Sequence, residues 1–93
     1  MLAFLIAGSA GLSAQSLTVT GTVTDATGFP LPGAAVFVTG TSNGSITDAD
    51  GRYELSGVAR DASLTVDILG YKSRTVGVGG RQVINFTLEE DSM

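Results

Sequence analysis

The chain has 93 residues, a net charge of −4 at pH 7 and 43% hydrophobic residues. This length supports one small domain, and the composition is that of a globular protein. Cysteine and histidine are absent, which excludes disulfides, thiolate chemistry and the usual catalytic triads. The five basic residues are scattered over the second half of the chain, so no basic surface for nucleic acid is expected.

The first 15 residues, MLAFLIAGSAGLSAQ, are uncharged, apolar at first and then small. Leu2–Ala7 is too short to span a bilayer, and the small residues that follow fit a signal peptidase site. We therefore expect residues 1–15 to be a secretory signal that is cleaved after Ala14 or Gln15. The basic start of such a signal is missing, which indicates truncation at its beginning. The alternative is a buried N-terminal helix.

Residues 16–90 are expected to form the domain. The segment 17–24 alternates apolar residues with threonines, which predicts a strand with one apolar face and one threonine face. Gly21 on the apolar side indicates a bulge or a close packing contact. After a turn, two prolines predict a rigid extended crossing segment. In it, Leu31 is expected to pack at the core edge and Phe29 to be exposed.

The segment 34–39 is apolar on both faces, which suits a strand that is central in its sheet or covered on both sides. Asn43-Gly44 predicts a turn after it. Asp50-Gly51 predicts a type I′ hairpin turn, because that turn needs positive φ at both central positions. This hairpin would join a short strand at 44–47 to a half-buried strand at 52–58, whose residues alternate with period 2.

The rest of the chain repeats this pattern. Alternating segments at 64–69 and 76–78 are separated by a break at Gly70-Tyr71. Gly79-Gly80-Arg81 predicts a tight hairpin turn, and the last alternating segment is 84–88.

About seven strands are therefore expected, and no segment has the apolar spacing of a helix. The predicted fold is all-β, a small seven-stranded antiparallel β-sandwich. The acidic tail, 89–93, is expected to be solvated, with residues 91–93 beginning a linker.

Asp48-Ala49-Asp50-Gly51 resembles part of a calcium-binding loop. In such a loop glycine occupies the sixth position, and oxygen ligands occupy the first and twelfth. Placing Gly51 sixth puts Ile46 first and Gly57 twelfth, and neither can ligate. A polar turn is the simpler interpretation.

Other patterns also have simpler structural interpretations. Gly79-Gly80-Arg81 could cradle an anion, but no helix follows to add its dipole. Tyr53, Tyr71 and Phe29 could stack on a sugar, although spread aromatics are more often core and edge residues. The acids lie in turns, on polar strand faces or in the tail, so no carboxylate pair is expected in a pocket. We expect no enzyme, and no catalytic, cofactor-binding or metal-binding residues.

Several ordered blocks resemble the carboxypeptidase-regulatory-like domain. They read VTGTVTD at 19–25, PLPGA at 30–34, TDADG at 47–51 and GY at 70–71. The resemblance covers about residues 17–90. It implies a transthyretin-like seven-stranded sandwich, in agreement with the strand count.

The resemblance is closest to the copy at the N-terminus of SusC-type TonB-dependent outer-membrane transporters of Bacteroidota. There the signal often ends like Ser13-Ala14-Gln15. Phe29 departs from the pattern, since a charged or polar residue is usual there. The chain stops before any TonB box, plug or barrel, so it is interpreted as a fragment of a full receptor.

What this resemblance implies is a non-catalytic accessory domain at the periplasmic face of the outer membrane, without cofactors. The implied partners are proteins: the plug and barrel of the parent transporter, its surface lipoprotein, or the TonB system. No nucleic acid and no lipid-spanning segment in this chain are implied. The alternative is a free-standing secreted β-sandwich that binds carbohydrate or protein. No binding residues follow from the resemblance.

Overall fold

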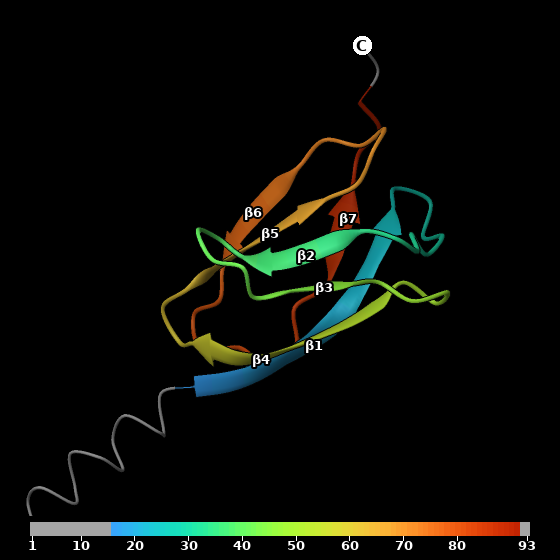
Figure 1. Ribbon diagram of the computed structural model, residues 1–93. Coiled ribbons are helices and arrows are strands. Elements are labelled where there is room, and N and C mark those ends of the chain that lie inside the picture. Colours follow the sequence, from blue (N-terminus) through green and yellow to red (C-terminus); the bar gives the residue numbers. More distant parts are fainter. Residues whose placement is uncertain (1–15, 92–93) are drawn as a thin grey trace, which may run out of the picture.

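The computed structural model describes residues 16–91 (Figure 1). The predicted signal, 1–15, lies outside the described residues. The described residues form seven strands: β1 (Ser16–Asp25), β2 (Ala35–Val38), β3 (Gly44–Ile46), β4 (Arg52–Ala59), β5 (Ser63–Asp67), β6 (Arg74–Gly77) and β7 (Phe86–Leu88). They form two sheets, ordered β4-β1-β7 and β3-β2-β5-β6. The predicted β-sandwich is confirmed. In the described part, no helix is long and apolar enough to cross a membrane.

One strand pair departs from a fully antiparallel sandwich. β1 is antiparallel to β4 but parallel to β7, whereas the pairs of the second sheet are all antiparallel. The reason is that the chain leaves β6 and crosses to the other sheet before β7 begins, so β7 runs in the direction of β1 (Figure 1).

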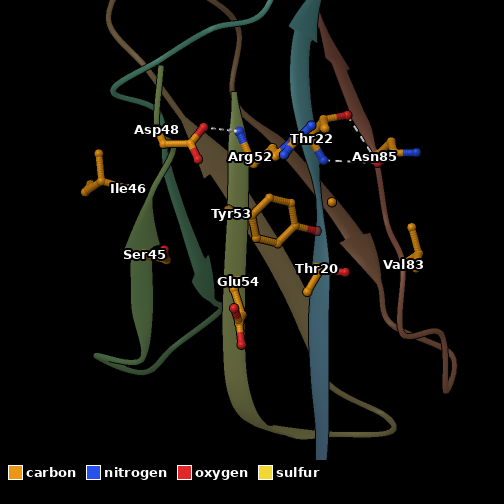
Figure 2. Close-up of a pocket in the computed structure, with 11 residues that line it drawn as sticks. Thr20, Thr22, Ser45, Ile46, Asp48, Arg52, Tyr53, Glu54, Val83 and Asn85 are labelled. Carbon is orange, nitrogen blue, oxygen red and sulfur yellow. Dashed lines mark hydrogen bonds between the residues drawn. The ribbon is translucent and has the colours of Figure 1, made fainter. Parts of the chain in front are cut away.

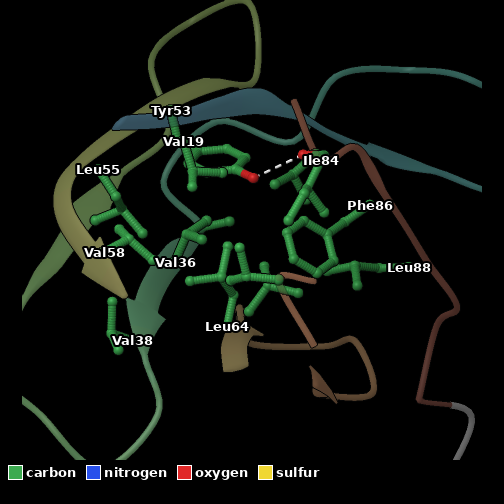
Figure 3. Packing of buried hydrophobic residues seen from close by; sticks show 14 of the residues in the cluster. Val19, Val36, Val38, Tyr53, Leu55, Val58, Leu64, Ile84, Phe86 and Leu88 are labelled. Carbon is green, nitrogen blue, oxygen red and sulfur yellow. Dashed lines mark hydrogen bonds between the residues drawn. The ribbon is translucent and has the colours of Figure 1, made fainter. Parts of the chain in front are cut away.

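The core lies between the two sheets and is built mainly from the inward residues of β1, β2, β4, β5 and β7 (Figure 3). Within it, the rings of Tyr53 and Phe86 pack against each other, with centroids 6.1 Å apart and ring planes tilted by 48°. The predicted positions of Leu31, buried at the core edge, and Phe29, exposed, are confirmed. The buried hydrophobic residues are Val19, Val23, Leu31, Ala34, Val36, Val38, Tyr53, Leu55, Val58, Leu64, Val66, Val78, Ile84, Phe86 and Leu88.

Gly21 makes the close packing contact that its position in β1 predicted. A Cβ at Gly21 would lie 1.8 Å from the carbonyl oxygen of Ile84 and 3.0 Å from a ring carbon of Tyr53. The β1–β4 pair also contains a bulge, but it is not at Gly21. Leu17 pairs with Val58, and Val19 pairs with Leu55, so the extra residue is in β4.

The prediction of a type I′ turn at Asp50-Gly51 is wrong. Gly51 has a φ of +75°, but Asp50 does not have positive φ. The Gly51 N–H donates to Asp48 O at 2.9 Å, and the Asp48 N–H donates to Arg52 O at 3.0 Å. These are the bonds of a type I turn followed by a left-handed glycine. The flanking strands, β3 and β4, then part into different sheets.

Two other predicted turns also differ in detail. Gly44 is the first residue of β3, and the turn precedes it, with Gly40 at a φ of +81°. Gly79 and Gly80 have φ values of +56° and +73°, and the Arg81 N–H donates to Val78 O at 3.1 Å. This turn has positive φ at both central positions, but it leads into the crossover to β7 and does not form a hairpin.

The acidic tail is attached to the domain by its backbone. The Lys72 N–H donates to Glu89 O at 2.9 Å, and the Asp91 N–H donates to Gly70 O at 2.9 Å. Between these two bonds, Tyr71 and Glu90 form an antiparallel bridge. Glu89, Glu90 and Asp91 are exposed as predicted, but their main chain closes one end of the sandwich.

Candidate functional site

The PLPGA and TDADG blocks meet at one junction, which is organised by Thr47. Thr47 is the buried polar residue among those described, at 4% exposure. Its hydroxyl donates to the carbonyl oxygen of Leu31 at 2.6 Å and accepts from the N–H of Ala34 at 2.9 Å. The main chains of the two blocks are also joined, because the Thr47 N–H donates to Ala34 O. The two blocks therefore hold each other in place.

Gly51 joins the same junction to β1. Its carbonyl oxygen accepts from the Val23 N–H at 2.8 Å, and the Leu31 N–H donates to Val23 O at 2.9 Å. A Cβ at Gly51 would lie 2.7 Å from Val23 O, so only glycine fits between the strand and the proline segment. The residues of these blocks therefore explain how the fold is held together.

Two aspartates stabilise the neighbouring turns. One carboxylate oxygen of Asp25 accepts from the N–H and hydroxyl of Thr27 and from the N–H of Phe29. One oxygen of Asp48 accepts from the N–H groups of Asp50 and Arg52, both at 2.9 Å. The hydroxyl of Thr27 lowers the pKa of Asp25, and the N–H of Arg52 lowers the pKa of Asp48. Both carboxylates are therefore stable anions and poor general acids.

The calcium pattern does not assemble into a ligand set. The Asp48 oxygen named above already accepts two backbone N–H groups of its own turn. Within residues 16–91, no three histidine, cysteine, aspartate or glutamate residues are grouped so as to hold a metal ion.

An open groove of about 570 Å³ crosses the outer face of β1 and β4, and we call it the β1–β4 groove (Figure 2). Its walls carry hydroxyl and amide groups, one cation and two carboxylates, with Ile46 and Val83 at its two sides. Thr22 donates to Asn85 through both its N–H and its hydroxyl. The groove is lined by Thr20, Gly21, Thr22, Ser45, Ile46, Asp48, Arg52, Tyr53, Glu54, Val83 and Asn85.

The other residues considered from the sequence are not brought together. Tyr53 is buried, and burial raises its pKa to about 12. Tyr71 is half-buried, and Phe29 is exposed, so the three aromatics form no sugar-stacking platform. The guanidinium of Arg81 donates to the carbonyl oxygens of Gly77 and Val78, so it is engaged with its own turn.

Comparison with known proteins decides the family. The family model of the CarboxypepD_reg-like domain matches residues 19–93. The chain belongs to this family. This CarboxypepD_reg-like domain is 41% identical over 80 residues to TonB-dependent receptor P39 of Formosa agariphila. The alignment covers 86% of this chain and 8% of that receptor.

It is also 40% identical over 95 aligned positions to TonB-dependent receptor SusC of Bacteroides thetaiotaomicron, covering 99% of this chain and 9% of SusC. The CarboxypepD_reg-like domain thus spans less than a tenth of the length of these receptors. These relatives are TonB-dependent receptors.

Solved structures share the fold of this CarboxypepD_reg-like domain. A type II cohesin–X–dockerin complex from Acetivibrio cellulolyticus matches with a TM-score of 0.66 at 22% identity, covering 83% of this chain and 60% of the matched chain. The major pilin subunit BcpA of Bacillus cereus matches with a TM-score of 0.52 at 16% identity, covering 81% of this chain and 28% of the pilin. At these identities the likeness concerns the fold alone.

Proposed function

We propose that this chain is the N-terminal, non-catalytic accessory domain of a SusC-like TonB-dependent outer-membrane nutrient transporter, exported and lying at the periplasmic face of that membrane. The observation that carries the proposal is the 40% identity to SusC over 99% of the chain. The site supports a role without catalysis. The carboxylates of Asp25 and Asp48 are held as anions by their own turns, and the Tyr53 hydroxyl is committed to Ile84.

In this proposal the domain acts through protein contacts, with the plug, barrel, surface lipoprotein or TonB system as partners. A tethered domain reaches a high effective concentration near its neighbours, so weak contacts are sufficient. The backbone closure at Glu89–Asp91 gives the chain a fixed point of exit at one end of the sandwich. A segment that follows this end would therefore emerge in a defined direction.

The test uses an antibody against residues 16–91 on fractionated native cells. The expected result is an outer-membrane band of the size of a whole transporter, whose N-terminal peptide in mass spectrometry begins at Gln15 or Ser16. A soluble species with only the mass of this domain would contradict the proposal and favour the free-standing binding module, for which the β1–β4 groove would be the first surface to examine.

A further inference from the structure

Among the strands of residues 16–91, β6 is the outer strand of its sheet and pairs only with β5. The Val78 N–H donates to Ala62 O at 2.8 Å, and this bond fixes which residues face β5, because the direction alternates along an antiparallel strand. By this alternation, the main-chain groups of Thr75 and Gly77 point away from β5. Among the described residues, the Thr75 N–H and C=O and the Gly77 N–H have no hydrogen-bond partner.

The fold also gathers basic side chains around this edge, although they are far apart in the sequence. The Arg74 guanidinium donates to Thr87 O at 3.2 Å, and Arg81 donates to Gly77 O. Arg60 lies beside the turn after β6, since a Cβ at Gly80 would be 2.8 Å from its guanidinium. Lys72 stands just before β6, 3.7 Å from Glu89. Four of the five basic residues of a chain with a net charge of −4 therefore lie in β6 or near its two ends.

The other edge strands, β3, β4 and β7, are less suited to pairing with an added strand. β3 has 3 residues, and the groove beside it carries two carboxylates, of Asp48 and Glu54, with the single cation of Arg52. β4 is partly covered, because the Asn43 side chain donates to Ser56 O at 2.8 Å. At β7, the side chain of Arg74 occupies Thr87 O. β6 is thus the edge that combines free main-chain groups with positive charge.

We propose that the β6 edge binds an extended, acidic segment of a partner protein by strand addition. Main-chain hydrogen bonds to Thr75 and Gly77 give the affinity in this mode, and side-chain charge gives the selectivity. A hollow of about 380 Å³ beside the strand, lined by Lys72, Ser73, Arg74, Thr87, Leu88 and Glu89, offers room for a partner side chain.

The same charges act against pairing between two copies of this chain. Two β6 edges would bring Arg74 and its neighbours against like charges, which destabilises a strand pair. The acidic tail of a second copy is not available either, because its main chain already pairs with Gly70–Lys72. A second copy of this domain is therefore not the partner, and the inference stands whether or not the domain belongs to a transporter.

The test measures binding of a fluorescent peptide of alternating Glu and Thr to the chain by anisotropy, with a peptide of alternating Lys and Thr as the probe control. Thr75→Pro removes the outward N–H without touching the bonds to β5, since proline is tolerated on an edge strand when its nitrogen faces solvent. Thr75→Val is the matched variant, because it also loses the hydroxyl bond to Thr65 but keeps the N–H. We expect the acidic peptide to bind, the basic one not to bind, and Thr75→Pro to weaken binding about tenfold relative to Thr75→Val.

Equal affinity of these two variants would overturn strand addition, as would the absence of any binding by the acidic peptide. If Thr75→Pro does not fold, Arg74→Glu decides, with an expected loss of affinity for the acidic peptide and a gain for the basic one. If Arg74→Glu leaves the affinities for both peptides unchanged from those of the wild type, the charge selectivity is overturned. Amide exchange gives an independent readout, because the Thr75 and Gly77 amides should become protected only when peptide is bound.

Discussion

The hydroxyl of Tyr53 in β4 donates a hydrogen bond of 2.6 Å to the carbonyl oxygen of Ile84, on the far side of β1 (Figure 3). The bond passes Gly21, where a Cβ would lie 1.8 Å from the same oxygen. Tyr53 is 4% exposed, so this hydrogen bond joins the segment just before β7 to β4 inside the core. Glycine is required at position 21 because the hydrogen bond between Tyr53 and Ile84 leaves no room there for a side chain.

Tyr53→Phe is expected to lower the free energy of unfolding by about 1–3 kcal/mol, because the buried Ile84 oxygen loses its donor. Urea denaturation followed by circular dichroism measures this loss. Gly21→Ala should cost more than Tyr53→Phe, since the added methyl meets a backbone oxygen that a side-chain rotation cannot remove. A Tyr53→Phe midpoint equal to that of the wild type would contradict the proposed role of the bond.

Alkaline pH provides a second test of Tyr53. Burial raises its pKa from 10.0 to about 12. The folded chain therefore keeps this proton where the unfolded chain loses it, so stability is full below pH 10 and falls as the pH rises toward 12. Two pKa units correspond to about 2–3 kcal/mol. Urea titrations at several pH values should show this fall in the wild type and in Tyr71→Phe, but not in Tyr53→Phe.

The strands and the core could be predicted from the sequence because alternation is a local signal. Val19, Leu64 and Phe86 are buried where the period-2 pattern placed them. The partners of the strands could not be predicted in the same way. Asp50-Gly51 marks a turn, but the strands on either side of it pair with other strands. β3 pairs with β2, and β4 pairs with β1. The parallel pairing of β7 follows from a crossover that no local pattern indicates.

The candidate surfaces show the same limit. Thr47 is an ordinary polar residue in the sequence, and its buried position depends on tertiary contacts with Leu31 and Ala34. Arg60 and Arg81 are scattered along the chain, yet both lie at the turn that follows β6. Such groupings depend on tertiary contacts, and residue spacing along one sequence does not reveal them.

Gly51→Val is expected to destabilise the domain by more than about 1 kcal/mol, because a β-branched residue is strained at positive φ. Here the φ is +75°, and a Cβ would also lie 2.7 Å from Val23 O. Gly28→Val is the matched control, since Gly28 has a φ of +93° with nothing near its Cβ position. Thermal melting should rank Gly51→Val below Gly28→Val. The reverse order would show that the contact with β1 does not matter.

Thr47→Val is expected to cost about 1–3 kcal/mol, although the two side chains have nearly the same shape. The substitution leaves the buried N–H of Ala34 and the carbonyl oxygen of Leu31 without their shared hydroxyl. Thr47→Ser keeps the hydroxyl and should retain most of the stability in urea denaturation. If Thr47→Val is as stable as Thr47→Ser, the hydroxyl is not what joins the two sequence blocks.

The last prediction concerns the tail, which the sequence indicated to be solvated and without a packing role. Its backbone bonds, Lys72 N–H to Glu89 O and Asp91 N–H to Gly70 O, close the end of the sandwich at which the chain leaves the domain. A chain that ends at Leu88 loses both bonds. At a net value of about 0.5–1.5 kcal/mol each, it should be about 1–3 kcal/mol less stable than a chain that ends at Asp91.

The matched control replaces Glu89, Glu90 and Asp91 by their amides, which removes the charges and keeps the main chain. Because the ion pair between Lys72 and Glu89 is exposed, its loss should change stability little. Urea midpoints of the three chains then separate backbone closure from charge. If the amide variant is as unstable as the truncated chain, the tail acts through its charges. If the truncated chain matches the one ending at Asp91, the closure contributes nothing to the fold.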